Sequence, residues 1–132
     1  RMLMGLDMYL TGEKFIPTHD GKHARPIVDG YKVSSTILDL GQWRKHHALH
    51  ECIEQAYVKS DGRILLEPEF LLEIADAVKQ GNLPEANYSP QTDAFHKEPE
   101  EIAKTVKIFR DAYDWVNRED GFWRSVYYEG SW

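Results

Sequence analysis

The sequence has little cysteine, no long apolar run and no excess of positive charge. Cys52 is the single cysteine of the 132 residues, which excludes an internal disulfide or a multi-cysteine metal cluster and favours a cytoplasmic location. No stretch approaches the roughly 18 consecutive apolar residues that a membrane-spanning helix needs, and no signal peptide is evident. The formal net charge of −6 disfavours broad nucleic-acid binding through phosphates.

Common catalytic and cofactor motifs are missing as well. The chain has no glycine-rich phosphate-binding loop of the P-loop or dinucleotide type, and no GxSxG nucleophile elbow. Cys52 lies on the apolar stripe of an expected helix, where a thiol is usually inert. We therefore predict no cofactor, and no reaction follows from composition alone.

Hydrophobic periodicity predicts one α+β domain over 1–132. Leu6, Met8 and Leu10 alternate with polar residues, as in a strand with one buried face. Strands are expected at both ends of the chain, so the terminal strands should pair in a small, mostly antiparallel sheet packed against about three helices. The predicted elements are strands at 6–11, within 31–40, at 63–66 and at 122–128, helices over 42–58, 68–80 and 100–117, and long loops at 16–30 and 82–98.

The densest polar cluster lies at the start of the helix expected over 42–58. On that helix Leu49 faces the core, His46 and His50 border it on one flank with Trp43, and His47 lies just beyond. Histidine exchanges protons near neutral pH, and a tryptophan ring stacks on planar ligands. The cluster is therefore either a binding wall or an ordinary core boundary, the commoner role for histidines in such positions.

Two further uses of these histidines are weighed. His46 and His50 are four residues apart, a spacing that can place two imidazoles on one ion, but no third ligand is fixed, so we predict no metal site. Asp7 interrupts the apolar residues of the first strand and would pair with Arg44 or Lys45 if it were covered. Asp7 and His50 are the candidate catalytic residues, with His50 as general base and Asp7 orienting it.

The C-terminal segment 122–132 is rich in aromatic residues. On a strand, Val126 and Tyr128 share one face, whereas Trp123 and Tyr127 lie on the other. Because large rings are rarely left in contiguous exposed patches, a helix, a ligand or a partner should cover the second face. A homodimer formed through this aromatic end is one such arrangement.

Three short blocks resemble a family of small, largely uncharacterised proteins encoded by bacteriophages and bacterial genomes. These are GLDMYL at residues 5–10, a central segment at 43–52 that matches WRKxNxIHxW in part, and an aromatic end at 127–132 similar to one closing in SSW. His47 stands where the pattern has Asn, Cys52 where it has Trp and Gly130 where it has the first Ser. The resemblance implies a phage or prophage origin and a single constellation of Asp7, Tyr9, Trp43, Arg44, Lys45, His50 and Trp132.

Three functional hypotheses follow. The first is a pocket for a nucleotide-like or other small anionic ligand, with rings stacking on it and cations meeting its anionic part. The second is an acidic inhibitor of a host protein, as in counter-defence, based on the acidic residues between 98 and 120. The third is the His/Asp-dependent hydrolase or transferase. The residues predicted to bind the ligand are Asp7, Tyr9, Trp43, Arg44, Lys45, His47, His50, Tyr127 and Trp132.

Overall fold

The first strand organises the sheet. In a computed structural model that describes residues 5–17, 21, 24–57, 62–84 and 94–132, strand β1 spans Asp7–Phe15. Leu6, Met8 and Leu10 are fully buried along one face, as their alternation predicts. Antiparallel neighbours flank β1: β4 (Ser35–Arg44) on one side and β6 (Trp123–Ser131) on the other. The short strand β5 (Ile64–Leu66) pairs with β6, giving the order β4-β1-β6-β5.

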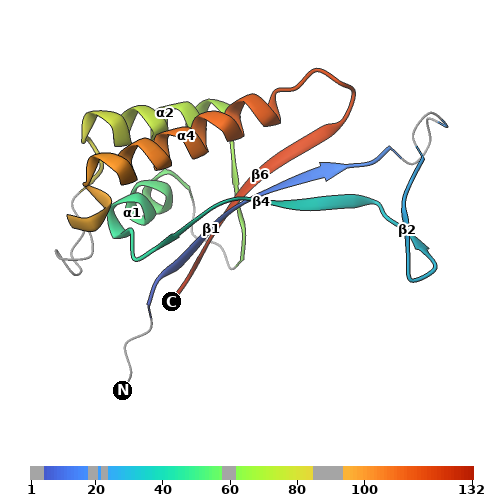
Figure 1. Ribbon diagram of the computed structural model, residues 1–132, viewed down its shortest axis with the longest axis horizontal. Coiled ribbons are helices and arrows are strands. Elements are labelled where there is room, and N and C mark those ends of the chain that lie inside the picture. Colours follow the sequence, from blue (N-terminus) through green and yellow to red (C-terminus); the bar gives the residue numbers. More distant parts are fainter. Residues whose placement is uncertain (1–4, 18–20, 22–23, 58–61, 85–93) are drawn as a thin grey trace.

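The predicted fold class is confirmed. The N- and C-terminal strands pair over their whole length, with Met8 opposite Gly130 and Leu10 opposite Tyr128. Three longer helices, α1 (His47–Ala56), α2 (Pro68–Gln80) and α4 (Pro99–Val116), lie together on one side of the sheet (Figure 1). We call the sheet face under these helices the inner face and the opposite one the outer face. The core lies between the helices and the inner face.

Local sequence signals set the bounds of α2 and α4. Pro68 and Pro99 occupy the first turn of their helices, where a missing N–H costs nothing. Gly81 ends α2 in the left-handed conformation, with φ 69°, and its amide reaches the last carbonyls of the helix. The helices predicted over 68–80 and 100–117 therefore match the structure closely.

The helix predicted over 42–58 is wrong in its first turn. Residues 42–44 belong to β4, where Gln42, Trp43 and Arg44 pair with Tyr9, Met8 and Asp7 of β1. The chain turns at Lys45, which has φ 56°, and α1 begins only at His47. Pairing with a distant strand outweighs the local helical period here. The strand expected within 31–40 is likewise split into β3 (Tyr31–Lys32) and the longer β4.

The two segments predicted as long loops are partly structured. Strand β2 (Ile27–Val28) pairs with β3 in a separate hairpin, and a single helical turn occupies 94–96. Residues 18–20, 22–23 and 85–93 of these segments lie outside the described part. Figure 1 shows the β2–β3 hairpin at the far end of the β1–β4 ribbon, away from the helices, and its residues Ile27, Val28 and Tyr31 are exposed. We call this hairpin the arm.

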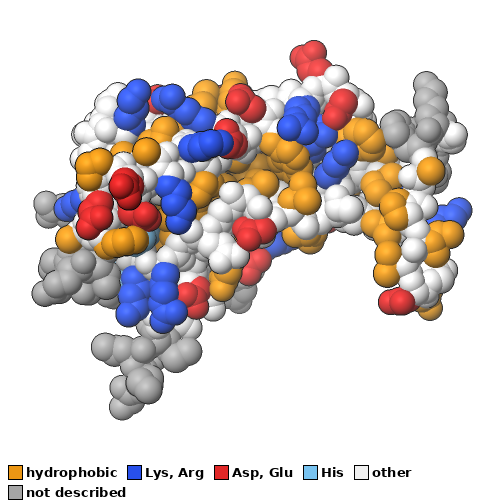
Figure 2. Space-filling view, viewed as in Figure 1, with side chains coloured by type: hydrophobic (Ala, Val, Ile, Leu, Met, Phe, Trp, Pro, Cys, Tyr) orange, Lys and Arg blue, Asp and Glu red, His pale blue; other side chains and the backbone are white. Residues whose placement is uncertain are grey.

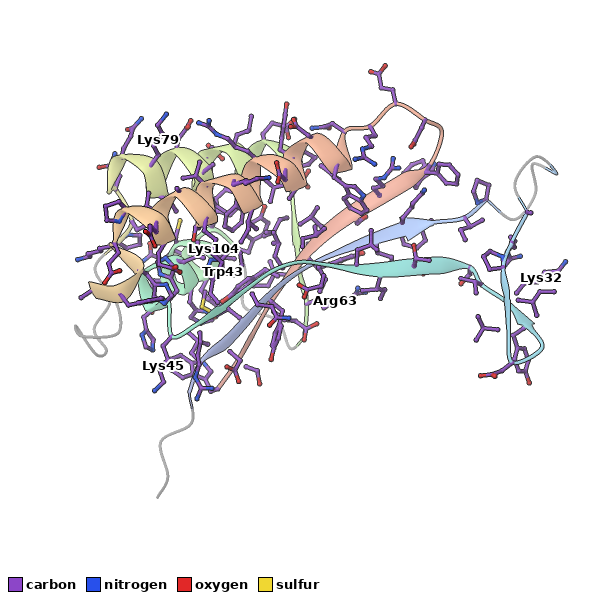
Figure 3. All side chains as sticks on the ribbon, viewed as in Figure 1. Lys32, Trp43, Lys45, Arg63, Lys79 and Lys104 are labelled. Atoms are coloured by element: carbon purple, nitrogen blue, oxygen red, sulfur yellow. The ribbon has the colours of Figure 1, made fainter. Side chains whose placement is uncertain are left out.

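Trp43 fastens the edge strand β4 to helix α4. Its indole Nε1 donates a hydrogen bond of 2.9 Å to Thr105 Oγ1, and both residues are buried. The same ring stacks on Phe109, with centroids 5.3 Å apart and planes at 14°. Figure 3 shows Trp43 between the sheet and the helices. Trp43 thereby attaches the edge strand β4 to the core.

The Trp43–Thr105 hydrogen bond gives a first prediction. Thr105→Val keeps the volume but leaves the indole N–H without its acceptor, so the free energy of unfolding should fall by about 1–3 kcal/mol. Thr105→Ser, which keeps the hydroxyl, is the matched control and should cost less. Urea denaturation followed by circular dichroism measures both variants. A serine variant as unstable as the valine variant would show that the hydrogen bond contributes little.

Candidate functional site

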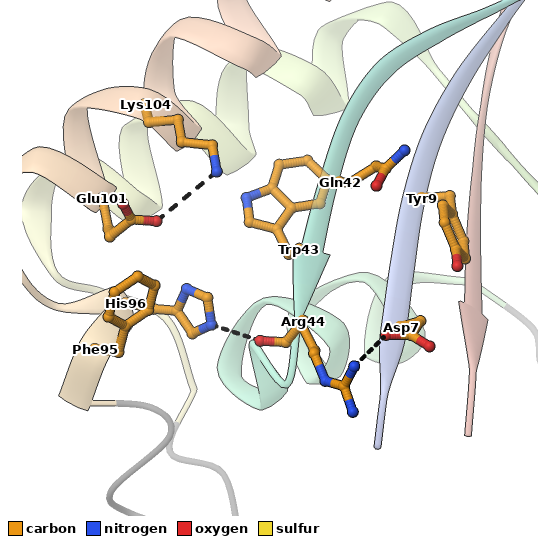
Figure 4. A pocket seen from close by; sticks show the side chains of 9 residues that line it. All are labelled: Asp7, Tyr9, Gln42, Trp43, Arg44, Phe95, His96, Glu101 and Lys104. Carbon is orange, nitrogen blue, oxygen red and sulfur yellow. Dashed lines mark hydrogen bonds and ion pairs between the residues drawn. The ribbon is translucent and has the colours of Figure 1, made fainter. Parts of the chain in front are cut away.

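A pocket of about 490 Å³ lies where the end of β4 meets the start of α4 (Figure 4). Strands β1 and β4 supply one wall from the outer face of the sheet, and the turn at 94–96 with the first turns of α4 supplies the other across the edge of β4. The wall residues combine rings with charges of both signs. They are Asp7, Tyr9, Gln42, Trp43, Arg44, Phe95, His96, Glu101 and Lys104.

The strand wall carries an exposed ion pair. Asp7 and Arg44 face each other across β1 and β4, and Arg44 Nη1 lies 3.9 Å from Asp7 Oδ1. Their side chains are 45% and 69% exposed, so water screens the pair and its contribution to stability is small. Arg44 is one of the two partners expected for a covered Asp7, but Asp7 is not covered, and the pair is a surface contact rather than a buried clasp. Tyr9 adds a partly exposed ring to this wall.

The helix wall is similar in character. Phe95 is 52% exposed, an unusual state for a phenylalanine. Lys104 Nζ lies 3.9 Å from Glu101 Oε1, one turn back on α4. Figure 4 shows Lys104 and Arg44 on opposite sides of Trp43, with His96 and Phe95 next to Glu101. Each wall thus offers one cation, one carboxylate and one exposed ring.

Trp43 lines the pocket without being available as a stacking platform. Its side chain is only 5% exposed because its ring already stacks on Phe109. Of the rings that line the pocket, those of Phe95 and Tyr9 are exposed. Trp43 instead forms a rigid floor, since its hydrogen bond and its ring contact fix its orientation.

Two stacked histidines support the pocket from behind. The His46 and His96 rings are nearly parallel, at 7°, with centroids 4.1 Å apart. His96 Nε2 donates to the Arg44 carbonyl at 2.8 Å, and His46 Nδ1 accepts from the Leu49 amide at the start of α1. Burial, with His96 and His47 nearby, lowers the pKa of His46 to about 3. His46 is therefore neutral at physiological pH.

A second cluster forms around His50 on the inner face. His50 Nδ1 and the Tyr128 hydroxyl share a hydrogen bond of 2.6 Å, and His50 Nε2 lies 3.9 Å from Glu54. The Trp132 ring lies 5.8 Å from that of His50 and 5.7 Å from that of His47. Burial raises the pKa of the Tyr128 hydroxyl well above its usual value, so this hydroxyl keeps its proton.

Gly130 makes this second cluster compact. A Cβ at this position would lie 2.8 Å from His50 Cε1, closer than packed atoms normally approach. The absence of a side chain lets the imidazole rest against the β6 backbone. A serine at this position would therefore disturb the packing of His50.

Asp7 and His50 lie on opposite faces of the sheet. Successive residues of β1 point to opposite faces, and Met8 is buried on the inner face, so Asp7 points to the outer one. His50 covers Tyr128 and Gly130 on the inner face, opposite Leu10 and Met8. Asp7 does not orient His50, and the predicted catalytic pair is not assembled.

Two other predicted ligand contacts lie away from the pocket. Tyr127 points to the outer face, where the Arg63 guanidinium stacks on its ring at 3.9 Å. Lys45 occupies the turn between β4 and α1, and its Cε would lie 3.2 Å from a Cβ placed on Gly5. The pocket therefore gathers Asp7, Tyr9, Trp43 and Arg44 of the predicted set, while His47, His50 and Trp132 form the second cluster.

The described residues do not provide a metal centre. Among them, no group of three or more His, Cys, Asp or Glu side chains could hold one ion. The weak candidates His46 and His50 each use Nδ1 in a hydrogen bond. Partial burial raises the pKa of the Cys52 thiol, which keeps it protonated and a poor nucleophile.

Five lining residues were not predicted: Gln42, Phe95, His96, Glu101 and Lys104. Phe95 and His96 lie in the segment predicted as loop, where no periodic pattern marks the direction of a side chain. The one available signal was the i,i+3 spacing of Glu101 and Lys104 on a predicted helix.

The chain matches no protein-family model, no curated protein and no solved structure at the significance level applied. In the described ranges, no helix has both the length and the apolar character to cross a membrane.

The low pKa of His46 gives a second prediction. Between pH 6.5 and about 3 the unfolded chain binds a proton at this position that the folded chain does not, so stability falls as the pH falls through this window. His46→Asn keeps a cap acceptor that does not titrate. The pH dependence of its unfolding free energy should be shallower than that of the wild type, by up to about 1.4 kcal/mol per pH unit. Parallel slopes from pH 7 to 4 would contradict this.

Proposed function

We propose that this protein binds a small molecule with a planar ring and an anionic group in the pocket between β4 and α4. The observation that carries the proposal is that exposed rings and two cations border the same hollow of about 490 Å³. A volume of this size accommodates a mononucleotide-sized ligand. A nucleotide-like compound combines the required ring and anionic group. This proposal is the first of the three functional hypotheses, now tied to a defined pocket.

The rings support a planar ligand. Phe95 and Tyr9 are exposed on opposite walls, and covering either with a ligand ring removes apolar surface from water. Gln42 is the partner of Tyr9 in the sheet and supplies an amide that can both donate and accept hydrogen bonds. Rings and an amide together suit a heterocyclic base better than an aliphatic chain.

The charges support an anionic group. Arg44 and Lys104 each have a carboxylate at 3.9 Å, and both cations are more than half exposed. The Arg44–Asp7 pair is exposed and weak, so a ligand anion can replace Asp7 there at little cost, whereas Glu101 is only 20% exposed. Asp7, once released, can accept hydrogen bonds from sugar hydroxyls or base amino groups. The two cations of the pocket can thus bind an anion, although two carboxylates balance their charge.

Ligand binding gives a third prediction. Differential scanning fluorimetry with a panel of nucleoside mono-, di- and triphosphates should raise the melting temperature for at least one member, because a ligand at 100 times its Kd adds about 2.7 kcal/mol to stability. Phe95→Ser and Arg44→Gln should each weaken that compound's binding by about tenfold.

The control is Arg118→Gln, which makes the same change at an exposed arginine outside the pocket lining. Its affinity for the compound should equal that of the wild type in isothermal titration. The proposal fails if no compound of the panel raises the melting temperature at millimolar concentration. It also fails if Phe95→Ser binds as tightly as Arg118→Gln.

A protein partner is the second candidate, supported by exposed rings rather than by acidity. The acidic residues of α4 are interspersed with exposed cations, as in the Lys107–Asp111 pair, so the surface is of mixed sign (Figure 2). By contrast, Trp123 at the aromatic C-terminal end is 81% exposed. Large exposed rings favour contact with another protein, either a host protein or a second copy.

The homodimer form of this candidate gives a fourth prediction. Trp123→Ser should shift self-association toward the monomer, since it removes the most exposed ring of the C-terminal strand. Tyr31→Ser, an equally exposed ring on the arm, is the control and should leave the mass unchanged. Light scattering after size exclusion measures both. A wild-type protein that remains monomeric at several hundred micromolar would rule out this dimer.

A further inference from the structure

A second hollow lies on the outer side of the helices, away from the candidate pocket. It has a volume of about 630 Å³ and runs along α4 beside the end of α2. Figure 2 shows Lys and Arg side chains over these two helices with hydrophobic side chains between them. We call this hollow the helix groove. Its lining residues are Lys79, Pro99, Ile102, Ala103, Val106, Lys107, Arg110 and Asp111.

The floor of the helix groove is apolar because of the way residues repeat on α4. At about 100° per residue, positions 99, 102, 103, 106 and 110 fall on one stripe, beside the stripe of Thr105, Phe109 and Ala112 that is buried in the core. Ile102 and Val106 are half-buried at the boundary of the two stripes. Ala103 is exposed, and its small side chain leaves the space that forms the hollow.

The rim of the helix groove is basic. Three cations, Lys79, Lys107 and Arg110, line it against one carboxylate, Asp111, although the chain as a whole has a net charge of −6. Lys107 pairs with Asp111, and Arg110 lies 3.5 Å from Asp76 on α2. Both carboxylates are more than 60% exposed, so a partner's acidic groups can compete for these cations at small cost.

We propose that the helix groove binds an amphipathic helix of another protein, with a short apolar ridge flanked by Asp or Glu. The apolar floor takes the ridge, and the three cations meet the flanking carboxylates, so charge complementarity selects an acidic partner. The lining from 99 to 111 covers about 18 Å along α4, the length of about three helical turns. The two hollows have no lining residue in common, so this inference is independent of the proposed small-molecule site.

The test uses two synthetic peptides of eighteen or so residues with the same leucine ridge at i, i+3, i+4 and i+7 positions. The first carries glutamates beside the ridge, and the second carries lysines there. Titration of each peptide into the isotopically labelled full chain, followed by amide chemical shifts, gives both affinity and location. The glutamate peptide should bind with shifts centred on 99–111 and Lys79, more weakly as salt is raised, and the lysine peptide should not bind.

Charge reversal then tests the basic rim. Lys79→Glu should weaken binding of the glutamate peptide by about tenfold. Lys32→Glu makes the same change at an exposed lysine on the arm, far from the helix groove (Figure 3), and should leave the affinity unchanged. Ala103→Gln fills the floor without changing charge and should also weaken binding. Far-ultraviolet circular dichroism confirms that each variant is folded.

Four results would overturn the inference. They are no binding of the glutamate peptide at millimolar concentration, equal binding of both peptides, shifts centred elsewhere on the chain, or the same loss of affinity from Lys79→Glu and Lys32→Glu. Shifts at the exposed Trp123 in place of 99–111 would assign the peptide to the C-terminal strand instead.

Discussion

The pairing of β4 with β1, fixed by Trp43 under α4, is the constraint on which both the fold and the pocket depend. It places the outermost strand against the helical layer through one buried hydrogen bond and one ring stack. The same register sets Arg44 opposite Asp7 and leaves the Arg44 carbonyl for His96. Without this pairing, Trp43 would not lie between the two walls of the pocket.

Much of the fold could be predicted from hydrophobic period and from helix-end residues. The alternation at Leu6, Met8 and Leu10 and the stripes of α2 and α4 are long and regular, and proline and glycine mark where those helices begin and end. The strand at 42–44 could not be predicted, because its partner is more than thirty residues earlier in the chain. Lys45 at positive φ breaks the apparent helix without any glycine or proline to signal it.

The sequence predicted the pocket residues only where they lie opposite one another on the paired strands β1 and β4. Asp7, Tyr9 and Arg44 reach the pocket because they alternate with core residues on paired strands. The helix predicted over 42–58 placed Trp43 and Arg44 beside His50. In the structure the pocket and the cluster around His50 are separate. Since neighbours on a strand point to opposite faces, Trp43 enters the core while Arg44 remains in water. Phe95 and His96 come from a segment with no periodic pattern, which explains why they were missed.

Helix α4 contributes to both proposed binding surfaces, and its geometry keeps them separate. Glu101 and Lys104, which line the pocket, lie about 60° or more around the helix from every groove position between Pro99 and Arg110, and Asp111, which is on the side of Lys104, lies about two turns further along. The core stripe through Thr105 and Phe109 lies beside both and anchors the helix to Trp43. A ligand in the pocket and a helix in the groove would therefore contact one rigid element on different sides. The two surfaces share no lining residue, so binding at one does not displace the ligand of the other, and α4 is the element that connects the two.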